Sequence, residues 1–527
     1  MESSTPPPDA SPKTPGPDLV LLRVLMGLAL LLALLTLSLS FREKSLLLHP
    51  PLSEDGYYSM TIARNIAGGR GISVDGRTPT NGFQPLFTFL SVPVFVLAGP
   101  DRILGVRLFL ALHWLFYVAT AAVLGGILRD ALDPRDARGR RLAPWCAATL
   151  YLSLFPVFGH HFNGLETGCL LLSYSVVLRY AQTHALETPA EPAVLGSLLG
   201  LTVLSRIDAV FFVILACAYL LLRSDGPART RLQPAATAAA TAFLISSPWW
   251  FYSVLAFGSL LPSSGAAEQA WALDARRLGV MATALLRNLM PIYFHDADER
   301  PEADAVRALL LVGMLALFWV HRFEVRKWRL ASAERGRHLL GLSGCLALSS
   351  LMLALWYPLS SWAVHFYARY LAPLLLLVVL LLARALLALA GARPWSAAAV
   401  LLVLGASVPF EVLRSYREPI IERNIFVRRQ LTLVESRVPP EEWVAALQTG
   451  TLGYFRDRVL NLDGKVNPEA LRRRHDIWRY LDEQGVRWLC DWPELFRPFF
   501  GSRPEEHGWE LQERSGKFAL YHRRVEN

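Results

Sequence analysis

Two adjacent carboxylates stand just after the first long apolar run of the chain. They are Glu54 and Asp55, in the stretch LSEDGYYSMTIARNIAGGRG at residues 52–71. Ser53 is a favourable N-cap, so the pattern predicts a surface helix that begins at Glu54. Acids in the first turn of a helix interact favourably with its dipole, whereas a carboxylate at a membrane surface can act as a general base. The residues alone leave both interpretations open.

Four further charged residues lie at predicted helix ends. They are Glu166 in NGLETG, Arg206 and Asp208 in SRIDA, and Arg369 in YARYLAPL. Arg206 and Asp208 could pair and simply fix the ends of their helices, and Arg369 could extend its head group to the membrane interface. A guanidinium also presents a planar fork of donors that suits phosphate. The two arginines therefore allow a structural role or the binding of an anionic group. Glu166 allows a dipole-compatible helix start or a contact with substrate or metal near Asp55.

The composition of the chain is typical of a membrane protein. Of its 527 residues, 53% are hydrophobic and 18% are charged, and the mean hydropathy is +0.32. Apolar runs of about 20 residues recur, each long enough to cross roughly 30 Å of hydrocarbon. The sequence therefore predicts an α-helical polytopic membrane protein. Arginine-rich loops that meet anionic membrane lipids explain the net charge of +9, so no nucleic-acid partner is expected.

We expect about eleven transmembrane helices. The candidate segments are residues 19–41, 103–128, 143–159, 164–181, 192–205, 209–223, 233–257, 304–321, 338–357, 369–390 and 395–412. The apolar run 85–99 is shorter and contains Pro93. We interpret it as an interfacial or re-entrant helix within a first outer loop that covers residues 42–102.

Lysine and arginine in the short loops predict the orientation. Residues 135–141, 223–231 and 321–329 are strongly basic. These loops fall on one side only if the N-terminus is cytoplasmic. We therefore expect a multi-pass protein of the cytoplasmic membrane, with the acidic pair and the C-terminal region on the outer side.

The two ends of the chain differ from its apolar middle. Residues 1–18 are rich in Pro and Ser and predict a disordered cytoplasmic N-terminus. A transmembrane module follows at 19–412, and residues 413–527 predict a small extracytoplasmic α/β domain. In that domain VLNLDG, GVRWLCDW and FALYHRR are typical of strands, and EEWVAAL and PEALRRRHDIWRYLDEQG are typical of amphipathic helices.

A set of short elements runs in order from the first helix to the C-terminal domain. The elements are Glu54-Asp55 with GYYSMTIARNIAGGRG, TPTNGFQPLF, NGLETG, SRIDA, LLPSSGAAE, YARYLAPL and TLGYFRDRVLNLDGKVN. This set resembles the GT-C superfamily of polytopic glycosyltransferases, whose mark is an acidic pair in the first outer loop. The chain departs from the pattern where Glu54 replaces the usual Asp, Phe87 the usual Trp, and Ser263 a common Asn.

The resemblance implies an inverting glycosyltransferase that moves a sugar from a polyprenyl-phosphate-linked donor to an acceptor hydroxyl on the outer side of the cytoplasmic membrane. The acceptor would be a glycan, a lipid or a protein. Asp55 is then the general base, Glu54 supports it, and Arg369 with Arg206 binds the donor phosphate. The other expected substrate-binding residues are Tyr58, Asn81, Gln84, Glu166, Asp208 and His365.

No metal ligands and no cofactor are assigned, because the histidines lack a metal-binding spacing, but a divalent cation stays open. The chain also has no convincing nucleotide-binding motif, which favours a lipid-linked donor over a nucleotide sugar. A polytopic transporter or flippase is one alternative function. Against it, the ionisable residues cluster at the outer face, whereas transport sites usually lie near the membrane midplane. A non-catalytic protein of cell-envelope assembly is the other alternative.

Overall fold

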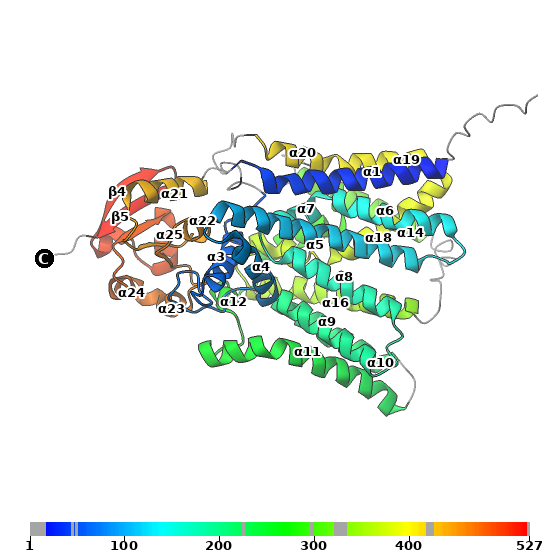
Figure 1. The fold of residues 1–527 in the computed structure, drawn as a ribbon, viewed down its shortest axis with the longest axis horizontal. Coiled ribbons are helices and arrows are strands. Elements are labelled where there is room, and N and C mark those ends of the chain that lie inside the picture. Colours follow the sequence, from blue (N-terminus) through cyan, green and yellow to red (C-terminus); the bar gives the residue numbers. More distant parts are fainter. Residues whose placement is uncertain are drawn as a thin grey trace, which may run out of the picture.

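The computed structural model describes residues 17–43, 47, 51–223, 227–294, 300–320, 335–417 and 426–523. Long helices run side by side along the long axis of the molecule, and a small domain that contains the strands lies at one end of them (Figure 1). The basic segment 321–329 and residues 1–16 of the predicted N-terminal region lie outside the described residues.

Six helical segments among the described residues are long and apolar enough to cross a membrane. They are α1 (Pro17–Leu37) with the short helix after it, α5 (Arg102–Ala131), α11 (Ala228–Phe257), α16 (Arg335–Ser360), α18 (Leu374–Ala392), and α19 (Pro394–Gly405) with α20 (Ser407–Arg414). The chain is therefore a mostly helical, polytopic membrane protein, as expected. The apolar helices α4 (Pro85–Ala98), α9 (Ala190–Ser205) and α10 (Val210–Leu222) are shorter. The total of about eleven crossings stays a prediction.

The segment 143–159, expected as one span, is divided between two helices. These are α6 (Ala137–Ser153) and α7 (Phe155–Phe162), and their axes differ by 70°. Leu154 between them is extended, and Pro156 follows in the first turn of α7. Proline has no N–H for an i−4 hydrogen bond, and its ring clashes with the preceding turn. The helix therefore ends here and restarts in a new direction.

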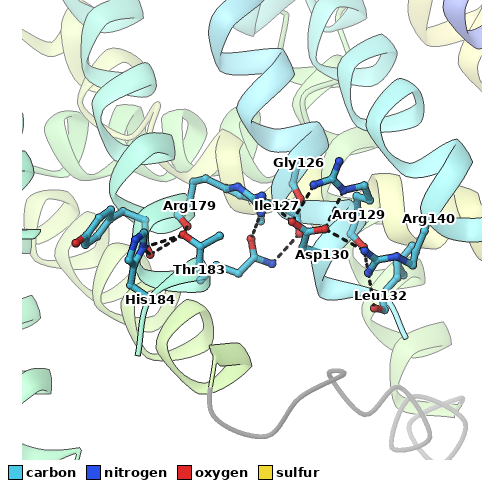
Figure 2. A network of polar contacts seen from close by, with 11 residues as sticks. Gly126, Ile127, Arg129, Asp130, Leu132, Arg140, Arg179, Thr183 and His184 are labelled. Carbon is cyan, nitrogen blue, oxygen red and sulfur yellow. Dashed lines mark hydrogen bonds and ion pairs between the residues drawn. The ribbon is translucent and has the colours of Figure 1, made fainter. Parts of the chain in front are cut away.

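Ion pairs join α5, α6 and α8 (Thr167–Thr183) at one end of the bundle. The carboxylate of Asp130 accepts hydrogen bonds from Arg129 at 2.8 Å, Arg179 at 2.6 Å and Arg140 at 3.3 Å (Figure 2). The other end of α5 meets the C-terminal domain, where Arg102 donates to the carbonyl oxygen of Tyr454 at 2.9 Å. The basic loop between α5 and α6 therefore lies at the end of the bundle away from that domain. Which end faces the cytoplasm stays a prediction.

The C-terminal domain contains a five-stranded mixed sheet with the strand order β2-β1-β3-β5-β4. The strands are β1 (Val444–Ala446), β2 (Val459–Asn461), β3 (Trp488–Asp491), β4 (Trp509–Ser515) and β5 (Phe518–Arg523). β1 pairs in parallel with β2 and β3, and β5 pairs antiparallel with β3 and β4. Helices that include α21 (Phe426–Arg437), α22 (Gly450–Phe455) and α25 (Pro493–Phe500) pack beside the sheet (Figure 1).

Two predictions for this domain are wrong in detail. EEWVAAL is not a helix, because its residues 444–446 form the strand β1 between β2 and β3. All three residues are buried, and a short buried apolar run does not reveal its secondary structure by periodicity. The second segment, predicted as one helix over 468–485, forms α23 (Pro468–Arg472) and α24 (Ile477–Glu483) with a 3₁₀ turn between them.

Candidate active site

The helix after the acidic pair, α3 (Gly56–Ala67), begins at Gly56 and not at Glu54. Asp55 is its N-cap residue, but the Asp55 side chain accepts no capping hydrogen bond. The Ser53 hydroxyl does not cap the helix either, since it donates to the carbonyl oxygen of Asn163 at 2.8 Å. A Cβ at Gly56 would lie 2.8 Å from the same oxygen, so the close approach requires glycine. The prediction of Ser53 as N-cap of a helix that begins at Glu54 is therefore wrong. The dipole interpretation of the two acids stays open, because Asp55 lies at the N-terminus of the helix.

Glu54 binds the C-terminal domain. Its carboxylate accepts hydrogen bonds from the main-chain N–H of Thr451 at 3.1 Å and from the Thr451 hydroxyl at 2.6 Å. Thr451 lies in the first turn of α22, where the neighbouring Gly450 leaves no room for a Cβ beside the Glu54 carbonyl. Burial raises the pKa of Glu54 to about 7, although the hydrogen bonds from Thr451 act in the opposite direction. Glu54 therefore fixes the domain against the outer loop.

Asp55 forms an ion pair with Lys465. The Lys465 ammonium lies 3.3 Å from Asp55 Oδ2 and 3.2 Å from Glu268 Oε1, so it connects two carboxylates. Burial acts to raise the pKa of Asp55, but the positive charges of Lys465 and Arg369 outweigh it, and the pKa lies below its ordinary value. For Glu268 the effect of burial wins, and its pKa is raised. Asp55 is therefore held as a carboxylate.

Arg369 lies in the short helix α17 (Tyr367–Tyr370). Its guanidinium is 4.0 Å from the carboxylate of Glu166 and stacks over the Phe366 ring at 4.2 Å. Arg369 Nε and Glu166 Oε1 are buried and have no hydrogen-bond partner among the described residues. The guanidinium is thus only loosely neutralised, and it has donor capacity left for an anionic ligand.

Arg206 and Asp208 pair with each other at 2.7 Å, as the structural interpretation of these residues expects. Tyr357 donates a hydrogen bond to the second oxygen of Asp208 at 2.8 Å. The two remaining nitrogens of the Arg206 guanidinium donate to the carbonyl oxygens of Arg369 and Tyr370. Arg206 therefore supports the segment that carries Arg369.

One cavity of about 330 Å³ brings most of the expected residues together, and its size is within the range of small-molecule sites. The expected residues that line it are Asp55, Tyr58, Gln84, Glu166, Arg206, Asp208 and Arg369. Tyr357 and Tyr370 also line it, and their rings stack with centroids 3.6 Å apart. The cavity thus combines charged groups with an aromatic surface.

Two expected residues that line the cavity also have other partners. The Tyr58 hydroxyl donates to Asp463 at 3.2 Å, and the Gln84 side-chain oxygen accepts from the Ile207 N–H at 3.2 Å. Glu54, Asn81 and His365 are not among the lining residues. The Asn81 side-chain oxygen accepts from the Ser263 N–H at 3.1 Å, at the start of α12 (Ser263–Ala267), and His365 precedes the lining residue Phe366.

Lys465 and Glu268 were not predicted as site residues, although both line the cavity. Both lie within elements that resemble the superfamily, Glu268 in LLPSSGAAE and Lys465 in TLGYFRDRVLNLDGKVN. The charged residue in each of these two elements was therefore the signal from which Glu268 and Lys465 could have been predicted as site residues. The ion pair itself joins positions 410 residues apart in the case of Asp55 and Lys465, and no local pattern predicts such a contact.

The fold is similar to two solved membrane proteins. ArnT from Cupriavidus metallidurans bound to undecaprenyl phosphate matches with a TM-score of 0.57 and 13% identity, over 94% of this chain and 98% of ArnT. The apo state of the same protein matches with a TM-score of 0.51 and 16% identity, over 94% and 97%. An oligosaccharyltransferase from Archaeoglobus fulgidus in the apo form matches with a TM-score of 0.52 and 14% identity, over 89% of this chain and 70% of that protein.

The chain has the fold of the GT-C membrane glycosyltransferases. The likeness covers the helical bundle and the C-terminal domain together, since it extends over 94% of the chain. Residues 421–525 also match a family described as "Domain of unknown function (DUF8728)". No curated protein matches the chain. The resemblance that the motifs indicated is therefore confirmed at the level of the fold.

Proposed function

We propose that the protein is an inverting glycosyltransferase that moves a sugar from a polyprenyl-phosphate-linked donor to an acceptor hydroxyl. One observation carries the proposal: Asp55 and Arg369 line the same cavity in a chain with the GT-C fold. The similar ArnT structure contains undecaprenyl phosphate, which supports a polyprenyl phosphate as the carrier here. The acceptor is a glycan, a lipid or a protein.

In the proposed reaction Asp55 takes the proton of the acceptor hydroxyl while the oxygen attacks the anomeric carbon of the donor. The bond from the anomeric carbon to the phosphate oxygen breaks, and the phosphate leaves with the electron pair. A carboxylate of low pKa can do this, because the acidity of the hydroxyl rises sharply as its new bond forms. The ion pair with Lys465 supports this role, since it keeps Asp55 ionised.

Arg369 is the proposed contact of the leaving phosphate. Its guanidinium lines the cavity, its side chain is only 15% exposed, and its one ion-pair distance among the described residues is 4.0 Å. A preorganised charge in a site that excludes most water stabilises developing negative charge better than the same charge in bulk water. The loosely paired Arg369 is therefore suited to a phosphate that gains charge as the sugar departs.

Part of the cavity lining supports a lipid-linked substrate. Val210, Leu261 and Trp356 line the cavity and are 37%, 43% and 44% exposed. They lie on α10, on the segment before α12 and on α16. Apolar side chains that reach both the cavity and the molecular surface would let a polyprenyl chain remain in the membrane while its phosphate enters the site. We place the site at the outer face of the cytoplasmic membrane, with the N-terminus in the cytoplasm.

Binding and transfer by the purified protein test the proposal. Undecaprenyl phosphate binding is measured by native mass spectrometry. Sugar transfer is measured as the release over time of free undecaprenyl phosphate from the lipid-linked sugars in an extract of host membranes. We expect wild-type protein to bind and to release it, Asp55→Asn to bind without release, and Arg369→Ala to bind weakly. Asp75→Asn, a change in the same outer loop but away from the cavity lining, is the matched control and should behave as the wild type.

The same experiment separates the alternatives. A flippase would bind the lipid carrier but would leave the sugar–phosphate bond intact in both the wild type and Asp55→Asn. A non-catalytic assembly protein would release no undecaprenyl phosphate from any extract. Either result would contradict the proposal.

A further inference from the structure

The side chain of Lys465 reaches from the C-terminal domain into the cavity of the helical bundle. Lys465 follows β2, and its ammonium lies 3.3 Å from Asp55 and 3.2 Å from Glu268. Its side chain is 16% exposed. Asp55 and Glu268 therefore share one ammonium, and the C-terminal domain provides it.

Three residues, Asp463, Ser263 and Gly82, determine the position of the Lys465 main chain. Its N–H donates to Asp463 at 2.7 Å, and its carbonyl oxygen accepts from the Ser263 hydroxyl at 2.8 Å. A Cβ at Gly82 would collide with the same carbonyl oxygen, so only glycine allows the approach. Gly82 belongs to TPTNGFQPLF and Ser263 to LLPSSGAAE. Two separate motifs of the bundle thus hold Lys465, and its ammonium is preorganised in the site.

A divalent cation does not fit between these carboxylates. Asp55 and Glu268 provide the oxygen ligands that such cations prefer, but the Lys465 ammonium already lies within contact distance of one oxygen of each. Over the part of the chain that the structure describes, no group of three or more His, Cys, Asp or Glu residues could hold a metal ion. The oxygen atoms of Asp55 and Glu268 therefore bind an ammonium and leave no place for a divalent cation between them.

We propose that Lys465 is the resident cation of the site, in the position where a divalent cation would otherwise connect Asp55 and Glu268. It orients Asp55 toward the acceptor hydroxyl and balances one negative charge. One consequence is that sugar transfer needs no divalent metal. This consequence rests on the proposed function. The C-terminal domain then completes the active site and does not merely cover it.

Binding of Mn²⁺ to the purified protein, measured by electron paramagnetic resonance, tests the inference without any substrate. We expect no binding to the wild type at the cavity. Lys465→Met should bind Mn²⁺ at the cavity, with an affinity at least about tenfold above the limit set by the wild type, because a repelling positive charge has gone. Adding Asp55→Asn to this variant should remove the binding. Lys517→Met, which changes a lysine of the same domain that lies over the Trp492 ring, is the control and should resemble the wild type.

Activity provides a second measurement. Transfer by the wild type should be unchanged in EDTA. Wild-type binding of Mn²⁺ that Asp55→Asn abolishes would overturn the inference, and this result does not need a folded Lys465 variant. Loss of wild-type transfer in EDTA with recovery in Mn²⁺ would overturn it too. Failure of both transfer and undecaprenyl phosphate binding would instead count against the proposed function, and the Mn²⁺ measurement would still test Lys465.

Discussion

Arg206 donates hydrogen bonds to the main-chain oxygen of Arg369 at 3.1 Å and to that of Tyr370 at 3.2 Å. One arginine of the site thus fixes the position of the other. Arg206 was expected at the donor phosphate, and its contacts favour a role through Arg369. Both acceptors are main-chain carbonyl oxygens. Of the side chains at these three positions, only that of Arg206 therefore takes part in these hydrogen bonds.

A change of Arg206 to Lys should therefore weaken the site without removing its charge. Lysine cannot reach Asp208 and two carbonyl oxygens at once, and each buried hydrogen bond to a charged group contributes about 1.5–3 kcal/mol. We expect a lower unfolding temperature and weaker undecaprenyl phosphate binding. Thermal unfolding and native mass spectrometry measure the two effects. An unchanged unfolding temperature would show that the contacts add nothing.

Arg369 should tolerate no replacement if it binds the phosphate. Arg369→Lys keeps the charge but loses the planar fork, so transfer should fall strongly, and Arg369→Ala should lower it further. Gel filtration in detergent checks that both variants stay folded. Full transfer by Arg369→Ala would remove this residue from the proposed site.

The acidic pair should separate into two roles. Asp55→Asn should lower the transfer rate by about 10²–10⁴-fold, the usual contribution of a general base. Glu54→Gln should be milder, because Glu54 contacts Thr451 and does not line the cavity. Glu268→Gln is the informative comparison, since its raised pKa would also suit a base. An active Asp55→Asn with an inactive Glu268→Gln would assign the base to Glu268.

The stability of the folded protein should depend on pH through Glu54. Burial raises its pKa to about 7 from the ordinary value of 4.5. Such a group stabilises the fold below its unfolded pKa, and this contribution is lost as the pH rises through the folded pKa. The full loss corresponds to about 3 kcal/mol. Between about pH 5 and pH 8, the unfolding temperature should fall more steeply for the wild type than for Glu54→Gln. Parallel curves would mean that Glu54 does not titrate in this range.

Labelling of single cysteines in intact cells tests the orientation. Arg77→Cys in the outer loop and Gln512→Cys in the C-terminal domain should react with a membrane-impermeant thiol reagent, whereas Arg135→Cys should not. All three positions are exposed, so accessibility to the reagent depends on the side of the membrane. Reaction at position 135 from outside would reverse the orientation and place the site on the cytoplasmic side.

Seven of the ten site residues that the motifs predicted line the cavity. Four of these residues lie at helix ends, namely Glu166, Arg206, Asp208 and Arg369. Short local patterns indicate such residues, and the fold brings these helix ends together at the cavity. The strand β1 was missed because its three buried residues pair with strands before and after it in space, and this pairing is not a local property. Lys465 was missed for the same reason, since its partners belong to the bundle.

The sequence by itself determined that the chain is a polytopic membrane protein, because long apolar runs must be removed from water and can satisfy their main-chain polar groups as helices. It also determined which short elements resemble the GT-C glycosyltransferases. Only the tertiary structure decided the difference between Glu54 and Asp55. The two are neighbours in the chain, but one carboxylate meets Thr451, 397 residues away, and the other meets Lys465, 410 residues away. The pKa of each group depends on burial and on charges that the fold brings near, and neither is a property of the local sequence.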